Sequence, residues 1–263
     1  MEKALVLSGG GARCIAQLGY ISILEREGIK FNCFSGSSGG AIAASFLAKG
    51  FDPKEVFEII KEINVKKYIK LNLFKGSIFH LKKLEPLLKS YGLINFDSLK
   101  YKLFIAITDY EEYKTIYINK GDLAKYIIAS SSLIPIFAPY EIEDKLYIDG
   151  GFSDNLPVTP CKNYDFILAI NVNPPIQFKN SFFGNLYRAG YIMLNSNIKC
   201  SKKLVNKYVE LKECGNYSIF DTKNFDEIFK IGEDEAKKEL NFWEKFIKLE
   251  HNQHNSSLPN SKI

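Results

Sequence analysis

The chain of 263 residues is poor in histidine and has no long apolar run. Both features limit the kinds of functional site and of membrane attachment that we expect. Its three histidines, at positions 80, 251 and 254, leave few imidazoles for a catalytic base or a metal site. No uncharged apolar run approaches the ~18 to 20 residues that a membrane-spanning helix requires. The first residues, MEKALVLSGGGAR, lack the basic start and extended apolar core of a secretory signal. We therefore expect neither a spanning helix nor a secretory signal.

The sequence also shows no cysteine spacing typical of disulfides or metal clusters, and no strong excess of basic residues. The cysteines are odd in number and lack metal-type spacing, which is typical of unpaired thiols in a reducing cytosol; they are Cys14, Cys33, Cys161, Cys200 and Cys214. The net charge of +5 comes from 35 basic and 30 acidic residues, so it permits weak attraction to anionic membranes and does not indicate nucleic acid. These features predict a cytoplasmic protein without a metal.

What is present is an alternation of short apolar runs, glycine turns and helical periodicity. Residues 3–8 predict a buried strand, 13–27 a helix, 31–36 a second strand and 40–50 a helix of small residues. Strands that alternate with helices are typical of a mainly parallel sheet covered on both faces. The sequence therefore predicts one α/β domain.

Beyond residue 50 the same patterns continue. They predict helices over 52–63, 80–92 (with Pro86 marking a break or a start), 121–132 and 185–199, and one long helix over 225–249. They predict strands over 101–109 and 113–119, paired as a hairpin, and over 145–151, 164–172 and 207–213. The final residues are polar and aperiodic, which predicts a flexible tail.

The stretch GSSGG, residues 36–40, has the form G-x-S-x-G. An apolar strand precedes it and an alanine-rich helix follows it, which is the context of a nucleophile elbow. Ser38 fits this frame better than Ser37, because only Ser38 has glycine two positions before and after it. The N–H of Gly39 is then a candidate oxyanion donor. The alternative is a flexible turn without a catalytic role.

A second glycine turn, SGGGAR at residues 8–13, matches neither nucleotide-binding pattern, since Cys14 follows Arg13 where the dinucleotide motif needs glycine. Consecutive N–H groups of Gly9, Gly10 and Gly11 can instead face a developing negative oxygen. The alternative is a turn that only allows close packing between strand and helix.

A serine nucleophile also needs a proton acceptor. Two of the histidines fall in the polar tail and His80 opens a predicted helix, so a carboxylate whose proton affinity is raised by burial is the better candidate. Asp149 ends the strand in YIDGG, and Asp109 ends the strand in FIAITD. Aspartates at strand ends are commonly turn formers, so position alone does not choose between them.

Taken together, GGGAR, GSSGG and DGG ahead of DNLPV resemble the patatin-like phospholipases, in the same order and over roughly residues 3–175. The segments ASSSLIPIFAPY (129–140) and AITD (106–109) are similar to family segments as well. The resemblance implies a three-layer αβα sandwich with a mainly parallel central sheet, Ser38 as nucleophile, Asp149 as base, Gly9–Gly11 as oxyanion loop, and no metal or cofactor. Arg13 matches the family's basic residue, and it either steadies the loop or caps a surface. Cys14 departs from the family's usual glycine, which brings the fine geometry of the loop into question.

The implied activity is a lipid acyl hydrolase of phospholipase A or lysophospholipase type, within a catalytic domain over 1–250 and a flexible tail over 251–263. A soluble carboxylesterase or thioesterase with the same dyad, or a silent binding module, are the alternatives. The expected partner is a lipid or ester substrate. Aromatic residues interleave with basic residues in 66–83 and 174–188, as in a surface that touches a bilayer. Core aromatics beside solvated lysines are the favoured interpretation of these two segments.

Overall fold

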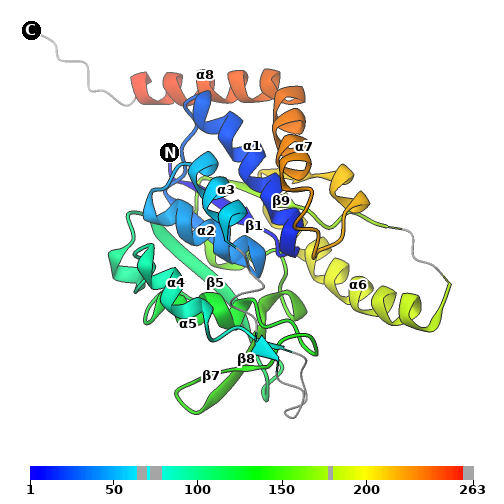
Figure 1. The fold of residues 1–263 in the computed structure, drawn as a ribbon. Helices are drawn as coiled ribbons and strands as arrows, with labels where there is room; N and C mark the ends of the chain where they lie inside the picture. The colour runs from blue at the N-terminus through cyan, green and yellow to red at the C-terminus, as the bar shows by residue number, and fades with distance from the viewer. Residues whose placement is uncertain (64–69, 72–78, 177–179, 257–263) are drawn as a thin grey trace, which may run out of the picture.

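A computed structural model describes residues 1–63, 70–71, 79–176 and 180–256 (Figure 1). The strands are β1 (Lys3–Leu7), β2 (Cys33–Ser37), β3 (Lys70–Leu71), β4 (Phe79–His80), β5 (Lys102–Asp109), β6 (Thr115–Ile118), β7 (Tyr140–Ile142), β8 (Lys145–Asp149), β9 (Phe166–Asn171) and β10 (Lys207–Glu210). The α-helices are α1 (Ile15–Arg26), α2 (Gly39–Lys49), α3 (Pro53–Glu62), α4 (Leu84–Ser90), α5 (Leu123–Ser130), α6 (Phe182–Ser201), α7 (Phe225–Lys238) and α8 (Leu240–Ser256). Short 3₁₀ helices are η1 (Gly11–Cys14), η3 (Phe96–Ser98), η4 (Gly150–Phe152), η5 (Thr159–Cys161), η6 (Lys202–Leu204) and η7 (Lys212–Asn216).

The central sheet has the strand order β10-β9-β1-β2-β5-β8-β7, with β6 paired to β5. The pairs from β10 to β5 along this order are all parallel, whereas β5–β8, β5–β6 and β7–β8 are antiparallel. The predicted α/β class with a mainly parallel sheet is confirmed, as is the hairpin of β5 and β6. Strand β7, three residues long, escaped prediction.

Alternating side chains of β1 and β9 fill two separate cores, one on each face of the sheet. Leu5, Leu7 and their neighbours pack against α1, α2, α5 and α7. Ala4 and Val6 face the other core, which is closed by Leu156, Val158, Cys161 and Ile198 from the segment before β9 and from α6. Strands buried on both faces explain why these runs are continuously apolar. Among the described residues, no helix is long and apolar enough to span a bilayer.

Strand β5 explains how two distant parts of the sequence meet. Ala106 pairs with Ser37 of β2 and with Tyr117 of β6, so β2 and β6 lie on opposite sides of β5. The next residue, Ile107, pairs with β6 and with Asp149 of β8. Strands β2 and β8 therefore lie end to end along the same side of β5, running in opposite directions. Their carboxyl ends face each other, which brings residues 38 and 149 together.

The predicted single helix over 225–249 is wrong, because the structure has two helices with a sharp turn at Glu239 (Figure 1). Helix α7 lies so close to α1 that a Cβ on Gly232 would come within 1.8 Å of the Ala16 carbonyl oxygen. The turn then lets α8 bury Trp243, whose Nε1 donates to Tyr20 Oη at 3.0 Å. A straight continuation of α7 would have left that indole without this burial.

Other boundaries also differ from the prediction. Helix α8 continues to Ser256, which places the first part of the predicted tail in a helix, while residues 257–263 lie outside the described residues. His80 lies in β4, and α4 begins at Leu84 with Pro86 in its first turn, where a missing N–H costs nothing. Strand β10 ends at Glu210, and the residues predicted to extend it form η7.

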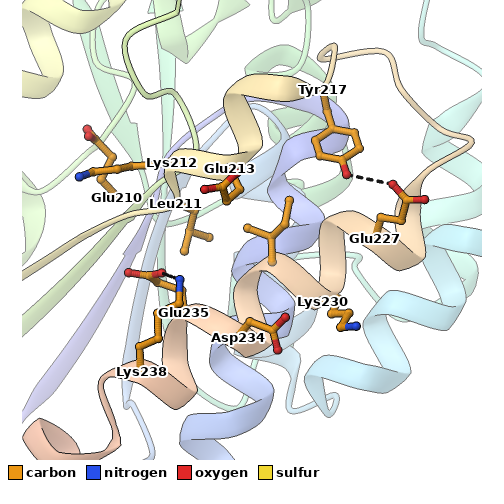
Figure 2. Close-up of a pocket in the computed structure, with 11 residues that line it drawn as sticks. Glu210, Leu211, Lys212, Glu213, Tyr217, Glu227, Lys230, Asp234, Glu235 and Lys238 are labelled. Carbon is orange, nitrogen blue, oxygen red and sulfur yellow. Dashed lines mark hydrogen bonds and ion pairs between the residues drawn. The ribbon is translucent and has the colours of Figure 1, made fainter.

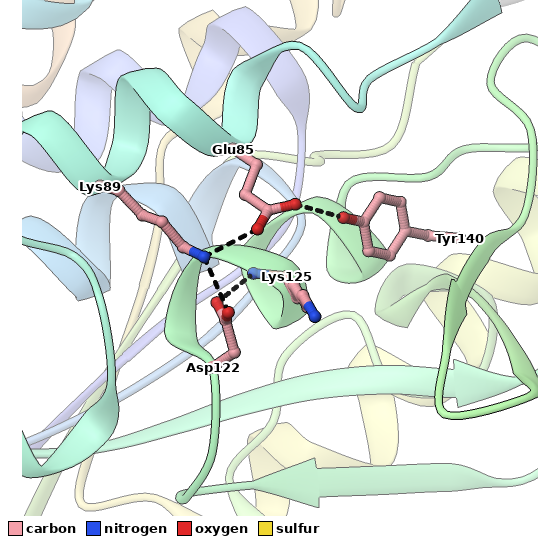
Figure 3. Close-up of polar contacts among 5 residues, drawn as sticks. All are labelled: Glu85, Lys89, Asp122, Lys125 and Tyr140. Carbon is pink, nitrogen blue, oxygen red and sulfur yellow. Dashed lines mark hydrogen bonds and ion pairs between the residues drawn. The ribbon is translucent and has the colours of Figure 1, made fainter.

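An ion-pair cluster fixes the start of α5, whose far end reaches the candidate site (Figure 3). Lys89 Nζ lies 2.7 Å from Glu85 Oε1 and 2.9 Å from Asp122 Oδ2. Asp122 caps α5 by accepting from the N–H of Lys125 at 3.2 Å, and Tyr140 Oη donates to Glu85 Oε2 at 3.0 Å. Helix α4, helix α5 and strand β7 are thereby joined.

Candidate active site

Ser38 stands at a sharp bend between β2 and α2. Its backbone has φ 52° and ψ −126°, a left-handed conformation that costs a residue with a side chain of order 1–3 kcal/mol. Its N–H donates to Ser130 Oγ at 2.9 Å, and that hydroxyl donates in turn to the Ala106 carbonyl at 2.7 Å. The strained bend is thus tied to β5 through the end of α5. This is the backbone geometry of a nucleophile elbow.

Asp149 lies directly beside this serine. Ser38 Oγ donates to Asp149 Oδ2 at 2.6 Å, and the N–H of Gly151 donates to Oδ1 at 2.7 Å. Only 3% of Asp149 is exposed. Burial raises the pKa of Asp149 from its ordinary 3.8 to about 6, although both hydrogen bonds pull the pKa down. The carboxylate is therefore a stronger proton acceptor than an exposed aspartate, while staying mostly ionised at neutral pH.

The first glycine turn packs against the bend that holds Ser38. A Cβ built on Gly9 would lie 2.9 Å from Ser38 Cβ, and one on Gly39 would lie 3.0 Å from the Gly11 carbonyl oxygen. Only residues without side chains allow the two turns this approach. Gly9 and Gly11 therefore lie directly against Ser38 and Gly39, the two residues that form the bend.

The three turn amides are not equivalent. The N–H of Gly9 donates to the Asn155 carbonyl at 3.1 Å, so the prediction that Gly9 offers a free donor is wrong. Among the described residues, no acceptor is bonded to the N–H of Gly10 or Gly11. The N–H of Gly39 stands at the first position of α2, where a helix has no internal acceptor. Gly10, Gly11 and Gly39 are the amides that remain available.

Two asparagines hold the Gly9 peptide in place. Asn173 Nδ2 donates to the Gly9 carbonyl at 2.6 Å, and Asn155 Nδ2 donates to the same oxygen at 3.4 Å. Both asparagines are buried, as is Asn171, whose Oδ1 accepts from the N–H of Asn173 at 3.0 Å. Sequence reasoning missed these residues and Ser130. Asn155 and Ser130 fall inside quoted motifs, whereas nothing in the pattern marks Asn173.

Arg13 is buried just behind the same turn. Its Nε donates to the Tyr217 carbonyl at 2.8 Å and its Nη1 to Tyr191 Oη at 3.5 Å. Tyr191 lies on α6 and Tyr217 follows η7, so the guanidinium joins three distant segments. These contacts favour the interpretation in which Arg13 steadies the loop.

Cys14 occupies the position where the resemblance leads one to expect glycine. Its backbone is ordinary right-handed helix, with φ −63° and ψ −17°. The buried thiol has a raised pKa, caused chiefly by desolvation, and donates to the Ser8 carbonyl at 3.4 Å. A Cβ on Gly39 would lie 2.8 Å from this sulfur. The thiol therefore fills the space beside Gly39 without distorting the start of α1.

The other polar candidates lie apart from this pair. Asp109 Oδ1 accepts from the N–H groups of Glu111 and Glu112, at 3.1 and 3.0 Å, which is the role of a turn former. Ser37 Oγ is buried without a hydrogen-bond partner in the part of the chain that the structure describes. The choice of Ser38 over Ser37, and of Asp149 over Asp109, agrees with these positions.

An open pocket of about 630 Å³ lies elsewhere, between α7 and the segment from β10 through η7 (Figure 2). Its wall is charged with both signs. Tyr217 Oη donates to Glu227 Oε2 at 2.9 Å, and Lys238 Nζ pairs with Glu235 at 2.8 Å. None of the predicted site residues lines this pocket. Its size alone does not make it the functional centre.

Comparison with known proteins finds its family match over the region of the chain that contains the candidate active site. The family model described as patatin-like phospholipase matches residues 5–162, a range that contains both glycine turns and Asp149. Lysophospholipase NTE1 of Candida glabrata is 26% identical over 278 residues, covering 89% of this chain and 16% of that protein. The uncharacterized protein YqhO of Bacillus subtilis is 28% identical over 188 residues, covering 58% of this chain and 64% of that protein.

A solved structure shares the fold. VipD from Legionella pneumophila superposes with a TM-score of 0.55 at 16% sequence identity, covering 91% of this chain and 67% of that chain. At this identity the likeness concerns the fold alone. The chain spans less than a fifth of the length of NTE1, so what that larger protein does as a whole is not transferred by the match.

Proposed function

Since the chain belongs to the patatin-like phospholipase family, we propose that it is a lipid acyl hydrolase of phospholipase A or lysophospholipase type, working through a dyad of Ser38 and Asp149. The observation that supports this most is the 2.6 Å hydrogen bond from Ser38 Oγ to a buried carboxylate, made at a strained bend. The relatives named lysophospholipase favour a lipid with a single acyl chain as the first substrate to test.

In the proposed reaction, Ser38 Oγ attacks the ester carbonyl while its proton passes to Asp149 Oδ2. The N–H groups of Gly10, Gly11 and Gly39 receive the negative charge of the tetrahedral oxygen. When the carbonyl re-forms, the C–O bond to the leaving alcohol breaks, and Asp149 gives that alcohol the proton. Water then loses a proton to Asp149 as it attacks the acyl-enzyme, and the proton returns to Ser38 as the fatty acid leaves.

A fluorophosphonate probe tests the nucleophile, and fatty-acid release from a lysophospholipid tests the substrate class. We expect one covalent adduct, located on Ser38 by mass spectrometry, together with loss of lysophospholipid hydrolysis in the labelled protein. Ser37 provides the internal control, because its hydroxyl lies in the adjacent position but inside the core. An adduct on any other residue would contradict the proposed dyad.

The pH dependence of hydrolysis follows from the raised pKa of Asp149, which is about 6 because the carboxyl is buried. Protonated Asp149 cannot accept the serine proton, so kcat/KM is expected to fall about tenfold per pH unit below pH 6. Above pH 6 the carboxylate is ionised and the rate should level off. Rates measured with a neutral p-nitrophenyl ester would report this limb without titration of the substrate. An unchanged rate down to pH 4 would exclude Asp149 as the base.

The alternatives keep the fold and change the substrate or the chemistry. A soluble carboxylesterase or thioesterase would hydrolyse water-soluble esters or thioesters in preference to lysophospholipid. A silent binding module would show neither hydrolysis nor the fluorophosphonate adduct. Hydrolysis of lysophospholipid, of a water-soluble ester and of a thioester, compared together with fluorophosphonate labelling, therefore separates the three functions.

A further inference from the structure

Helix α6 exposes large apolar side chains on the side that faces away from the protein. Phe182, Ile192 and Met193 are 79%, 63% and 61% exposed. Phe182, Ala189, Met193 and Cys200 follow one another at intervals of seven, four and seven residues, so they lie on one side of the helix. We call Phe182, Ala189, Ile192, Met193 and Cys200, all exposed, the outer face of α6. In Figure 1 this helix projects beyond the sheet.

The charged residues within the segment that contains this helix have one sign. Residues 166–209 contain no aspartate or glutamate but six basic residues, although the whole chain has nearly equal numbers of acids and bases. Lys199 and Lys203 are exposed at the end of α6 and in η6. Ile192 and Lys199 are seven residues apart, hence on the same side of the helix. Apolar residues beside lysines, in a segment without acidic residues, are typical of helices that lie on an anionic membrane surface.

Other side chains of α6 contact the segments around the candidate active site. Tyr191 Oη accepts from Arg13 Nη1 at 3.5 Å and donates to the Pro174 carbonyl at 2.6 Å. Asn197 Nδ2 donates to the Gly151 carbonyl at 3.4 Å, and its Oδ1 accepts from the N–H of Asn155 at 3.1 Å. One helix therefore contacts the segments that follow both the glycine turn and Asp149. A surface bound to its outer face would lie close to those segments.

We propose that the outer face of α6 docks on anionic lipid bilayers, with its apolar side chains in the interface and Lys199 and Lys203 against acidic headgroups. This inference rests on the proposed function, since binding to a bilayer brings a lipid hydrolase to the surface that contains its substrate. It places the membrane contact on α6, which overlaps the aromatic segment 174–188 at Phe182 and extends beyond it to Cys200. The other predicted segment, 66–83, falls largely outside the described residues.

The test is flotation of the full chain, carrying Ser38→Ala to prevent hydrolysis, with vesicles of phosphatidylcholine alone or mixed with phosphatidylserine. We expect binding to the mixed vesicles that weakens at high salt. The pair Ile192→Glu and Met193→Glu should lower the partition coefficient on the order of 100-fold, because two apolar side chains lose their interfacial burial. Lys199→Gln with Lys203→Gln should lower it by about tenfold or more, and only on the anionic vesicles.

The matched control is Ile94→Glu with Leu249→Glu, which adds the same charge at side chains that are 50% and 60% exposed on other elements. Unchanged flotation of this control supports the proposal. The proposal is overturned if the variant with both α6 substitutions still floats with the vesicles, or if the parent protein does not float with them. A dimer in light scattering that the α6 pair converts to monomer also overturns it, since a second copy then covers the face. Flotation without ester hydrolysis in the unmodified chain would reject only the proposed function.

Discussion

Ser38→Ala is expected to lower kcat for ester hydrolysis on the order of 10⁴- to 10⁶-fold, the loss seen when a serine nucleophile is removed from its catalytic unit. The change deletes Ser38 Oγ, which donates to Asp149 Oδ2 at 2.6 Å, and the residue at the bend keeps its Cβ. Hydrolysis of p-nitrophenyl esters and of lysophospholipid, measured on the same preparation, would show the loss. Because the buried carboxylate also loses its hydroxyl partner, circular dichroism and thermal unfolding should accompany the rates.

Ser37→Ala is the matched control for this change. Its hydroxyl is buried and, among the described residues, has no hydrogen-bond partner, so its removal breaks no hydrogen bond and is expected to be neutral or slightly stabilising. Activity close to that of the parent enzyme is the expected result. Equal losses in the two variants would show that the bend is simply intolerant of substitution, and a fully active Ser38→Ala protein would reject the nucleophile.

Much of the fold was predictable because the apolar runs of β1, β2, β5 and β9 are buried on both faces, and because β1 and β2 are followed by glycine turns. The placement of β2 and β8 end to end along one side of β5 was not predictable from the pattern, since it depends on the pairing of Ser37 with Ala106 and of Asp149 with Ile107. The motifs therefore predicted Ser38 and Asp149 as the candidate pair, but the physical reason for their meeting lies in the mixed part of the sheet.

The failures have physical causes as well. The turn at Glu239 is set by burial of Trp243 against Tyr20, a tertiary contact that a helical pattern running through both segments cannot reveal. The prediction for Gly9 failed for the same reason, because its N–H donates to the carbonyl of Asn155, which lies far along the chain. Local periodicity indicates which residues are helical or buried. It does not indicate which amides remain free.

Asp149→Asn is expected to lower kcat on the order of 10⁴-fold, because an amide keeps the shape of the side chain but cannot take the serine proton. The matched control is Asp109→Asn, which alters the other strand-end aspartate while leaving the serine and its partner in place. That variant should retain most of the activity. If Asp109→Asn were the damaging change and Asp149→Asn the mild one, the base would have been assigned to the wrong strand.

The same substitution should stabilise the fold at pH 8. The folded protein binds the Asp149 proton more tightly than the unfolded chain, with a pKa of about 6 against 3.8, so the contribution to stability is complete below pH 4 and is lost as pH rises through 6. At pH 8 the ionised carboxylate thus costs up to about 3 kcal/mol, which asparagine removes. Urea unfolding should give the variant the higher free energy of unfolding at pH 8 and a shrinking advantage toward pH 4.

The opposite signs separate a catalytic carboxylate from a structural one. At Asp109 the carboxylate accepts two backbone N–H groups, so its replacement by asparagine weakens charge-assisted hydrogen bonds and is expected to cost about 1 kcal/mol. Lower stability with activity retained is therefore expected at Asp109, and higher stability with activity lost at Asp149. A destabilised Asp149→Asn protein at pH 8 would mean that the carboxylate serves chiefly to hold the 149–151 turn, through its bond to the N–H of Gly151.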